Sequence, residues 1–332
     1  MAGPSVIAWK SMGSDAEVAA RSAPPMMRRE MSSRGVEASA PGKINVILRV
    51  LERRPDQYHN LWSVMQAVEL ADTVWVEEAP ASSGISLSCE GSELPAGPEN
   101  LVYRAAQAVL HRLKCSQGLR IRLRKRLPIA AGIGGGSSDA AATIQALALL
   151  LQTGWSRVQM AEIGEELGSD VPFFLYGPTA LIQGRGERVT PIRVEDERWL
   201  VLVNPGIAIP TVWAYGKLAE SRTRADSAWR SALPIAFPAD SPLHWNQLLS
   251  LMENDFQSVM EDAYPSLRDL RLLLLAHGAQ AAMLSGSGST VFGVFQSEKP
   301  ARQAADRLVR QPGWRLWVTR TLVEQELPRA FN

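Results

Sequence analysis

The sequence predicts an α+β fold of two lobes, because its strand and helix patterns do not alternate regularly. Alternating apolar residues, typical of strands with one buried face, occur at 44–50, 73–77, 85–89 and 119–124. Helical patterns follow at 100–113, 137–152 and 156–168. Several strands therefore precede the first helix, and a regular parallel sheet with crossover helices is not expected.

The second half of the chain predicts a smaller lobe of the split βαβ, or ferredoxin-like, type. A strand pattern at 199–204 and helical segments precede strands at 281–284 and 290–295, a helix at 299–309 and a strand at 314–321. We expect lobes at 36–182 and 183–326. Residues 1–35 show no sustained periodicity or secretory pattern, and we interpret them as a mobile tail.

Composition excludes several classes of function. The net charge is +1, so no overall field favours nucleic acid or a membrane surface as a partner. No apolar run approaches the roughly 18 residues of a spanning helix. Cys89 and Cys115 lack the spacing of a metal site, which favours a reducing compartment. We therefore expect a cytoplasmic protein with no nucleic-acid or membrane partner.

The most informative segment runs from Pro128 to Ala142 and places four glycines, at 132, 134, 135 and 136, between a strand and a helix. Glycines let the backbone approach an anion closely, and the first turn of a helix offers unpaired N–H groups with partial positive charge. This combination predicts a phosphate site. A flexible glycine loop is the alternative. The loop lacks the lysine of a P-loop, and Ser137 replaces the third glycine of a dinucleotide fingerprint.

The pattern P-x-x-x-G-x-G-G-G-S-S-[DN]-A resembles the ATP-binding loop of the GHMP kinases, a family of small-molecule kinases. The resemblance covers about residues 39–322 and implies a two-lobed GHMP kinase fold with an N-terminal ATP-binding lobe. It implies ATP as cofactor, with Mg²⁺ expected beside it and no metal ligand assigned. The ATP-binding residues it implies are Pro128, Ala130, Gly132, Gly134, Gly135, Gly136, Ser137, Ser138 and Asn100.

Three of these residues have a simpler alternative role. Ser137 and Ser138 could cap the N-terminus of the helix that follows the glycines, and Asn100 could cap the helix at 100–113. Capping and phosphate contact are compatible for the two serines.

The resemblance also implies a catalytic pair, Lys43 and Asp170. Lys43 lies in Pro41-Gly42-Lys43-Ile44-Asn45, and Asp170 lies in Gly168-Ser169-Asp170-Val171-Pro172. From the residues alone, the lysine reads as a surface charge and the aspartate as a helix N-cap. An ordinary aspartate has a pKa of about 4. It would therefore orient an alcohol and accept its proton as the new P–O bond forms, while the lysine would favour the ionised carboxylate.

Further segments resemble those of GHMP kinases that bind a cytidine diphosphate-linked sugar alcohol of the non-mevalonate isoprenoid route. The segment at 56–61 carries Tyr58 and His59, with Gln57 in place of the family's glycine, and the segment at 205–215 carries Thr211 and Tyr215. Aromatic stacking on a base contributes about 1–3 kcal/mol in single-stranded nucleic acids. The implied substrate-binding residues are Asn45, Tyr58, His59, Thr211, Tyr215, Gly286 and Ser287.

The implied reaction is ATP-dependent phosphorylation of the 2-hydroxyl of that sugar alcohol. Two alternatives stay open. One is a GHMP kinase that acts on another alcohol, such as homoserine or mevalonate, and the other is a non-catalytic nucleotide-binding homologue. The glycine-rich turn at 285–289 could be a simple hairpin turn rather than a substrate contact. A monomer and a homodimer are both compatible with the sequence.

Overall fold

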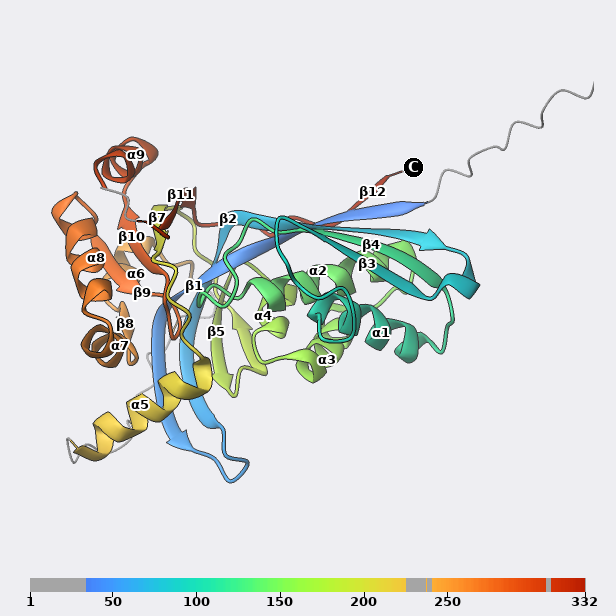
Figure 1. Ribbon diagram of the computed structural model, residues 1–332, viewed down its shortest axis with the longest axis horizontal. Coiled ribbons are helices and arrows are strands. Elements are labelled where there is room, and N and C mark those ends of the chain that lie inside the picture. The colour runs from blue at the N-terminus through green and yellow to red at the C-terminus, as the bar shows by residue number, and fades with distance from the viewer. Residues whose placement is uncertain (1–33, 225–236, 238–240, 309–311, 332) are drawn as a thin grey trace, which may run out of the picture. The chain divides into compact units, whose positions relative to one another are not determined.

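The described residues form two β-sheets whose inner faces share a core, with helices on both outer faces (Figure 1). The computed structural model describes residues 34–224, 237, 241–308 and 312–331. Most of the predicted tail lies outside these residues, although Gly35 already belongs to the first strand. The predicted α+β fold is confirmed, since both sheets contain antiparallel pairs.

The first sheet is built around two unusually long antiparallel strands, β1 (Gly35–Arg53) and β2 (His59–Ala79). Its main order is β12-β1-β2-β4-β3, while β5 and β6 extend the sheet from β2 and β8 pairs with β1. A short 3₁₀ helix at Ala81–Ser83 follows β2. The other strands are β3 (Ile85–Glu90), β4 (Gly118–Arg124), β5 (Thr179–Gly184), β6 (Arg188–Pro191), β8 (Glu253–Asn254) and β12 (Arg329–Phe331).

Four helices cover the outer face of the first sheet: α1 (Leu101–Leu113), α2 (Gly135–Leu150), α3 (Arg157–Leu167) and α4 (Val171–Tyr176). The start of α3 is set by a capping box, in which Ser156 and Gln159 satisfy each other's backbone N–H groups. Apolar residues of these helices and of the sheet form one buried cluster. The glycines at the start of α2 therefore lie on a helix that packing holds firmly against the sheet.

The second sheet has the strand order β11-β7-β10-β9, with every neighbouring pair antiparallel. Numbered along this lobe alone, the order is 4-1-3-2, which confirms the predicted ferredoxin-like arrangement. Its strands are β7 (Trp199–Asn204), β9 (Ala281–Leu284), β10 (Val291–Phe295) and β11 (Arg315–Arg320). Its helices are α5 (Thr211–Arg224), α6 (Trp245–Leu249), α7 (Gln257–Ala263), α8 (Pro265–Ala276) and α9 (Glu298–Arg307).

The sequence pattern underestimates the first two strands. The predicted strand at 73–77 is only the end of β2, because residues 62–68 are buried on both faces and show no alternation. The predicted helix start at 137 is also late, since α2 begins at Gly135. The proposed boundary at 182 falls inside β5, and β6 pairs with β5 beyond it. The first sheet therefore takes strands from beyond residue 182.

Candidate active site

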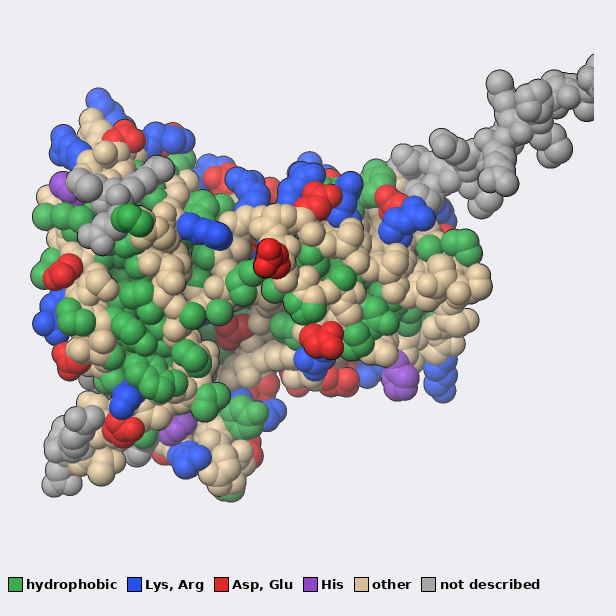
Figure 2. Space-filling view, viewed as in Figure 1, with side chains coloured by type: hydrophobic (Ala, Val, Ile, Leu, Met, Phe, Trp, Pro, Cys, Tyr) green, Lys and Arg blue, Asp and Glu red, His purple; other side chains and the backbone are tan. Residues whose placement is uncertain are grey.

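A cleft with a volume of about 540 Å³ is lined by residues of both lobes. Figure 2 shows a hollow near the middle of this face, and positive and negative side chains are intermixed over the surface around it. Most of the residues predicted from the sequence line this cleft. They are Lys43, Asn45, Asn100, Pro128, Ala130, Gly132, Gly134, Gly135, Gly136, Ser137, Asp170, Thr211, Tyr215, Gly286 and Ser287.

The phosphate loop, residues 128–137, has the backbone shape that its glycines suggest. Gly132 and Gly134 have φ values of +76° and +71°, which strain residues other than glycine. A side chain at Gly132 would also collide with the backbone of the turn at 285–288. Gly134 is the N-cap of α2, and no side chain caps this helix. The N–H groups of its first turn therefore face the cleft without a side-chain cap, as an anion site requires.

The two serines after the glycines do not share one role. Ser137 lines the cleft, whereas Ser138 is 1% exposed and lines a separate small cavity together with Ser39 and Gln145. Consecutive helix residues point about 100° apart, and only Ser137 of the two lines the cleft. The structure thus does not bring Ser138 to the predicted phosphate contact. Neither serine is the cap, because α2 already begins at Gly135.

Lys43 and Asp170 meet at the base of the cleft although 127 positions separate them in the sequence. The Lys43 Nζ lies 3.7 Å from an Asp170 carboxylate oxygen. It also donates hydrogen bonds to Asn45 Oδ1, at 2.6 Å, and to the carbonyl oxygen of Gly132, at 3.0 Å. Burial lowers the pKa of Lys43, and the nearby Asp170 carboxylate opposes this shift. The lysine is therefore a buried cation rather than the solvated surface charge of the simpler reading.

The Asp170 side chain is free for chemistry because it does not cap a helix. Asp170 occupies the N-cap position of α4, but its side chain makes no capping hydrogen bond. The carboxyl side chain is 31% exposed and faces Lys43. An anionic oxygen beside a buried ammonium group, at the edge of a phosphate loop, can accept a proton from a bound alcohol.

An aromatic wall, formed by His59, Tyr215 and Phe256, borders the cleft through Tyr215 and Phe256. The His59 and Tyr215 rings stack at a centroid distance of 5.4 Å, and Phe256 meets Tyr215 edge-on at 4.9 Å. Burial, and then the Asp170 carboxylate, raise the pKa of Tyr215, so its phenol stays neutral. Phe256 lines the cleft and was not foreseen from the sequence, since a lone phenylalanine carries no distinguishing pattern.

The structure does not bring Tyr58 into the cleft. Tyr58 lies in the turn between β1 and β2, its side chain is 57% exposed, and the Arg185 guanidinium lies 5.3 Å from its ring centroid. His59 is not among the residues that line the cleft, and its ring stacks on Tyr215, which lines it. Gln57 has φ +72°, which explains why a glycine would suit this position. The turn thus keeps a left-handed shape despite the substitution.

Asn100 fulfils the simpler of its two predicted roles. Its Oδ1 accepts a hydrogen bond from the Val102 N–H at 2.9 Å and so caps α1. Its Nδ2 donates to the Pro95 carbonyl oxygen at 2.9 Å. Asn100 lines the cleft, but these hydrogen bonds already occupy much of its amide.

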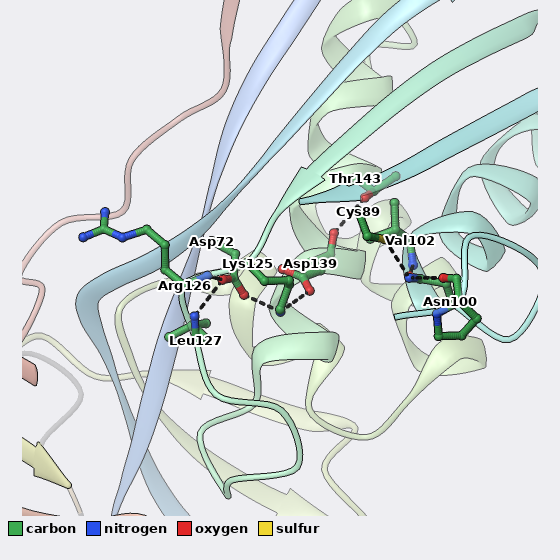
Figure 3. A network of polar contacts seen from close by, with 10 residues as sticks. Asp72, Cys89, Asn100, Val102, Lys125, Arg126, Leu127, Asp139 and Thr143 are labelled. Atoms are coloured by element: carbon green, nitrogen blue, oxygen red, sulfur yellow. Dashed lines mark hydrogen bonds and ion pairs between the residues drawn. The ribbon is translucent and has the colours of Figure 1, made fainter. Parts of the chain in front are cut away.

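A buried charge network that the sequence analysis missed also reaches the cleft (Figure 3). The Lys125 Nζ bridges the carboxylates of Asp72 and Asp139, and the Lys125–Asp139 distance is 2.6 Å. Asp72 also accepts hydrogen bonds from the backbone N–H groups of Arg126 and Leu127, which precede the phosphate loop. The network therefore ties β2, the phosphate loop and α2 together.

Asp139 is the acid of this network whose pKa is clearly shifted. Burial and the neighbouring Asp72 raise its pKa to about 8, although Lys125 acts in the opposite direction. One signal in the sequence could have revealed the site. Lys125 continues the alternation of the buried residues Leu119, Ile121 and Leu123, so its position predicts an inward-facing lysine.

The described residues contain no group of three or more His, Cys, Asp or Glu side chains arranged to hold a metal ion. No helix in the described ranges is long and apolar enough to cross a membrane. The hydroxyl of Ser137, which lines the cleft beside the glycines, is compatible with an ion that arrives with a phosphate ligand.

Comparisons with known proteins identify the class of kinase. Residues 100–178 match the family model of the GHMP kinases N terminal domain, and residues 241–313 match that of the GHMP kinases C terminal. The structure of homoserine kinase from Cytophaga hutchinsonii has the same fold, with a TM-score of 0.64 and 18% identity over 90% of this chain and 97% of that one. The chain belongs to the GHMP kinase family, as its motifs predicted.

Within that family the chain is similar to 4-diphosphocytidyl-2-C-methyl-D-erythritol kinases. It is 39% identical over 283 residues to the enzyme of that name from Citrifermentans bemidjiense, covering 85% of this chain and 98% of the relative. A crystal structure of 4-(cytidine 5'-diphospho)-2C-methyl-D-erythritol kinase matches with a TM-score of 0.71 and 33% identity, over 86% of this chain and 98% of that chain. The chain is thus an ATP-dependent small-molecule kinase.

Proposed function

We propose that this kinase transfers the γ-phosphoryl group of ATP to the 2-hydroxyl of 4-diphosphocytidyl-2-C-methyl-D-erythritol. The observation that carries the proposal is that one cleft is lined by the Lys43–Asp170 pair, by the phosphate loop and by the Tyr215 and Phe256 rings of the aromatic wall. The phosphate loop suits the donor, and the aromatic wall suits a nucleobase on the acceptor. Similar curated proteins carry the same activity in their names.

The acceptor hydroxyl would lie next to Asp170. As the new bond forms between the hydroxyl oxygen and the γ-phosphorus, the bond between that phosphorus and the β,γ-bridging oxygen breaks. The hydroxyl proton passes to the Asp170 carboxylate, and ADP leaves. Positioning and charge neutralisation supply most of the catalysis in such transfers.

Lys43 acts mainly by holding this arrangement together. Its ammonium group has two hydrogen-bond acceptors within 3.0 Å, on Asn45 and Gly132, and faces Asp170 with its remaining donor capacity. It therefore couples the position of the proton acceptor to the backbone of the phosphate loop. Asn45 is fixed in turn, because its Nδ2 donates to the Ser63 hydroxyl at 2.9 Å.

Mg²⁺ accompanies ATP in this proposal and supplies charge neutralisation on the phosphates when it is bound. Magnesium is usually held by substrate phosphates with few protein ligands, which agrees with the lack of a three-residue metal cluster in the described ranges. The Ser137 hydroxyl and the Glu99 carboxylate both line the cleft and would be available to contribute. A cytoplasmic location and a monomer or homodimer remain predictions from the sequence.

Homoserine and mevalonate are the alternative acceptors, since kinases for both share this fold. Neither carries a nucleobase, so neither would use the stack of His59, Tyr215 and Phe256. The test is ADP release by the purified protein with Mg-ATP and each of the three alcohols. Turnover with the cytidine diphosphate-linked alcohol alone is expected. Turnover only with homoserine or mevalonate would overturn the proposed acceptor and keep the kinase assignment.

A further inference from the structure

The turn at Ser285–Gly288, which joins β9 to β10, packs directly against the phosphate loop. The Ser285 hydroxyl donates to the Gly132 carbonyl oxygen at 3.0 Å, the same oxygen that accepts from Lys43. A Cβ on Gly286 would lie 3.0 Å from that oxygen. Ser287 lines the cleft beside it. The position of this turn therefore affects both the phosphate loop and the acceptors of Lys43.

The side chain of Asn254 holds the turn at Ser285–Gly288 through hydrogen bonds. It is 8% exposed, and its Nδ2 donates to the carbonyl oxygens of Leu284 and Gly286, both at 2.8 Å. Asn254 belongs to β8, which pairs with β1 through Leu48. Because both amide hydrogens are used, the side chain fixes the turn relative to the strand that carries Lys43 and Asn45.

The same amide group also reaches the aromatic wall. Asn254 Oδ1 accepts a hydrogen bond from the Phe256 N–H at 2.9 Å, and the Phe256 ring meets Tyr215 edge-on. Phe256 is 1% exposed, so its ring has little room to adjust. One buried side chain thus connects the turn against the phosphate loop with the aromatic wall.

A second buried asparagine, Asn204, provides a natural comparison at the other end of the same hairpin connection. Its Nδ2 lies 3.3 Å from the Ser289 hydroxyl and 3.2 Å from the Thr290 hydroxyl, and its Oδ1 accepts from the Gly206 N–H at 3.0 Å. Hydroxyls can donate as well as accept, whereas the carbonyl partners of Asn254 can only accept. A carboxylate could keep a hydrogen bond at position 204 and would repel both partners at position 254.

We propose that Asn254 is a positioning residue for phosphoryl transfer, which sets the spacing between the phosphate loop and the aromatic wall. It touches neither substrate and acts through Gly286 and Phe256. The role at the aromatic wall rests on the proposed function, because only an acceptor with a nucleobase uses that wall. The role at the phosphate loop depends only on ATP. The two can therefore be measured separately.

The test compares Asn254→Asp with Asn204→Asp, and uses Asn254→Ala, which removes the two donors without adding charge, in case the charged variant does not fold. Circular dichroism and a melting curve first establish that each variant is folded at the assay temperature. Calorimetry then gives the Kd for Mg-ATP, and ADP release gives kcat and KM with the cytidine diphosphate-linked alcohol.

A misplacement of about 1 Å near reacting groups can cost about 100-fold in rate. We expect a folded Asn254 variant to bind Mg-ATP about tenfold more weakly and to lose about 10- to 100-fold in kcat/KM, with a fall in kcat at saturation. Asn204→Asp should remain within about threefold of the parent protein. This contrast between two equally buried amides would not arise from a general loss of stability.

The proposal is overturned if folded Asn254 variants keep parental ATP affinity and kcat, or if Asn204→Asp is impaired to the same extent. It is also overturned if neither Asn254 variant folds, because the residue would then serve stability. Failure of the parent protein to use the cytidine diphosphate-linked alcohol would instead refute the proposed acceptor. The comparison of ATP affinities would still decide the role of Asn254 at the phosphate loop.

Discussion

Two buried lysines line the same cleft, and their surroundings differ in a way that separates catalysis from support. Lys43 is close to one carboxylate, Asp170, which is 3.7 Å away and partly exposed. Lys125 contacts two carboxylates, those of Asp72 and Asp139, which are almost fully buried. Burial lowers the pKa of Lys43, whereas for Lys125 the two carboxylates outweigh burial and raise the pKa.

The difference teaches how one cleft can use the same residue type for two purposes. The Lys125 ammonium group lies between the carboxyl groups of Asp72 and Asp139, and Asp72 also binds the backbone of Arg126, so the network is suited to fixing the start of the phosphate loop. The charge of Lys43 is only partly compensated, and its carboxylate partner remains accessible to a substrate. Incomplete compensation is typical of groups that take part in chemistry.

Replacement of the partly compensated pair should give the largest effect. We expect Lys43→Met and Asp170→Asn each to lower kcat by about 100- to 10,000-fold, as for loss of a general acid or base. The stability change should stay within about 1 kcal/mol, because Asp170 can be solvated once Lys43 is gone. Turnover assays and urea unfolding of the same preparations measure both. A kcat close to that of the parent would remove Lys43 and Asp170 from the mechanism.

For Lys125 we expect replacement to affect stability more than activity. Lys125→Met leaves the buried Asp72 carboxylate without its cation, and loss of one partner of a buried ion pair typically costs about 3–5 kcal/mol. We expect a large fall in the free energy of unfolding, and a kcat, measured below the melting temperature with saturating substrates, that falls less than for Lys43→Met. If Lys125→Met unfolds at the same urea concentration as the parent, the role of Lys125 in fixing the start of the phosphate loop is wrong.

The last of these effects concerns pH and Asp139. Its pKa of about 8 lies above the value in an unfolded chain, so the folded protein binds the extra proton between about pH 4 and pH 8. The contribution of this group to stability is therefore complete below about pH 4 and is lost as the pH rises through 8, by at most about 1.4 kcal/mol per unit.

Asp139→Asn tests this dependence, because an amide has no proton to lose in that range. The difference in unfolding free energy between the parent and the variant should shift in favour of the variant from pH 5 to pH 8. Denaturation at several pH values measures it, with Glu166→Gln as a control for loss of one acid elsewhere. A constant difference across the range would show that Asp139 is already ionised in the folded protein.

Local signals in the sequence were enough for elements whose cause is local. The Ser156–Gln159 capping box places the start of α3, and the glycine run places the phosphate loop between β4 and α2. The length of β2 could not be read in this way, since its middle is buried by helices on one face and by the second sheet on the other. Such burial comes from distant parts of the chain and removes the alternation that marks a strand.

The candidate site also combines residues that local motifs indicate with contacts that only the fold brings about. The family motifs indicated Lys43 and Asp170, but nothing in the spacing between them shows that they meet. Tyr58 and His59 are neighbours in the motif, yet His59 stacks on Tyr215 while Tyr58 is exposed, because adjacent residues at the edge of a strand point in opposite directions. Lys125 directly follows β4, whose arginines are exposed. Only its position in the alternation of buried and exposed residues distinguishes it from them.

The strand that carries Lys43 and Asn45 is bordered by residues from the far end of the chain. Near its start β1 pairs with β12, at Gly35–Phe331, and near its end it pairs with β8, at Leu48–Asn254. Long-range pairing of this kind slows folding, because loops must close before the contacts form. On the ribosome, β1 must therefore wait for residues 253–254 and 329–331 to emerge before these pairs can form. The phosphate loop and the catalytic pair would gain the support of the turn at 285–288 only after that turn has been made.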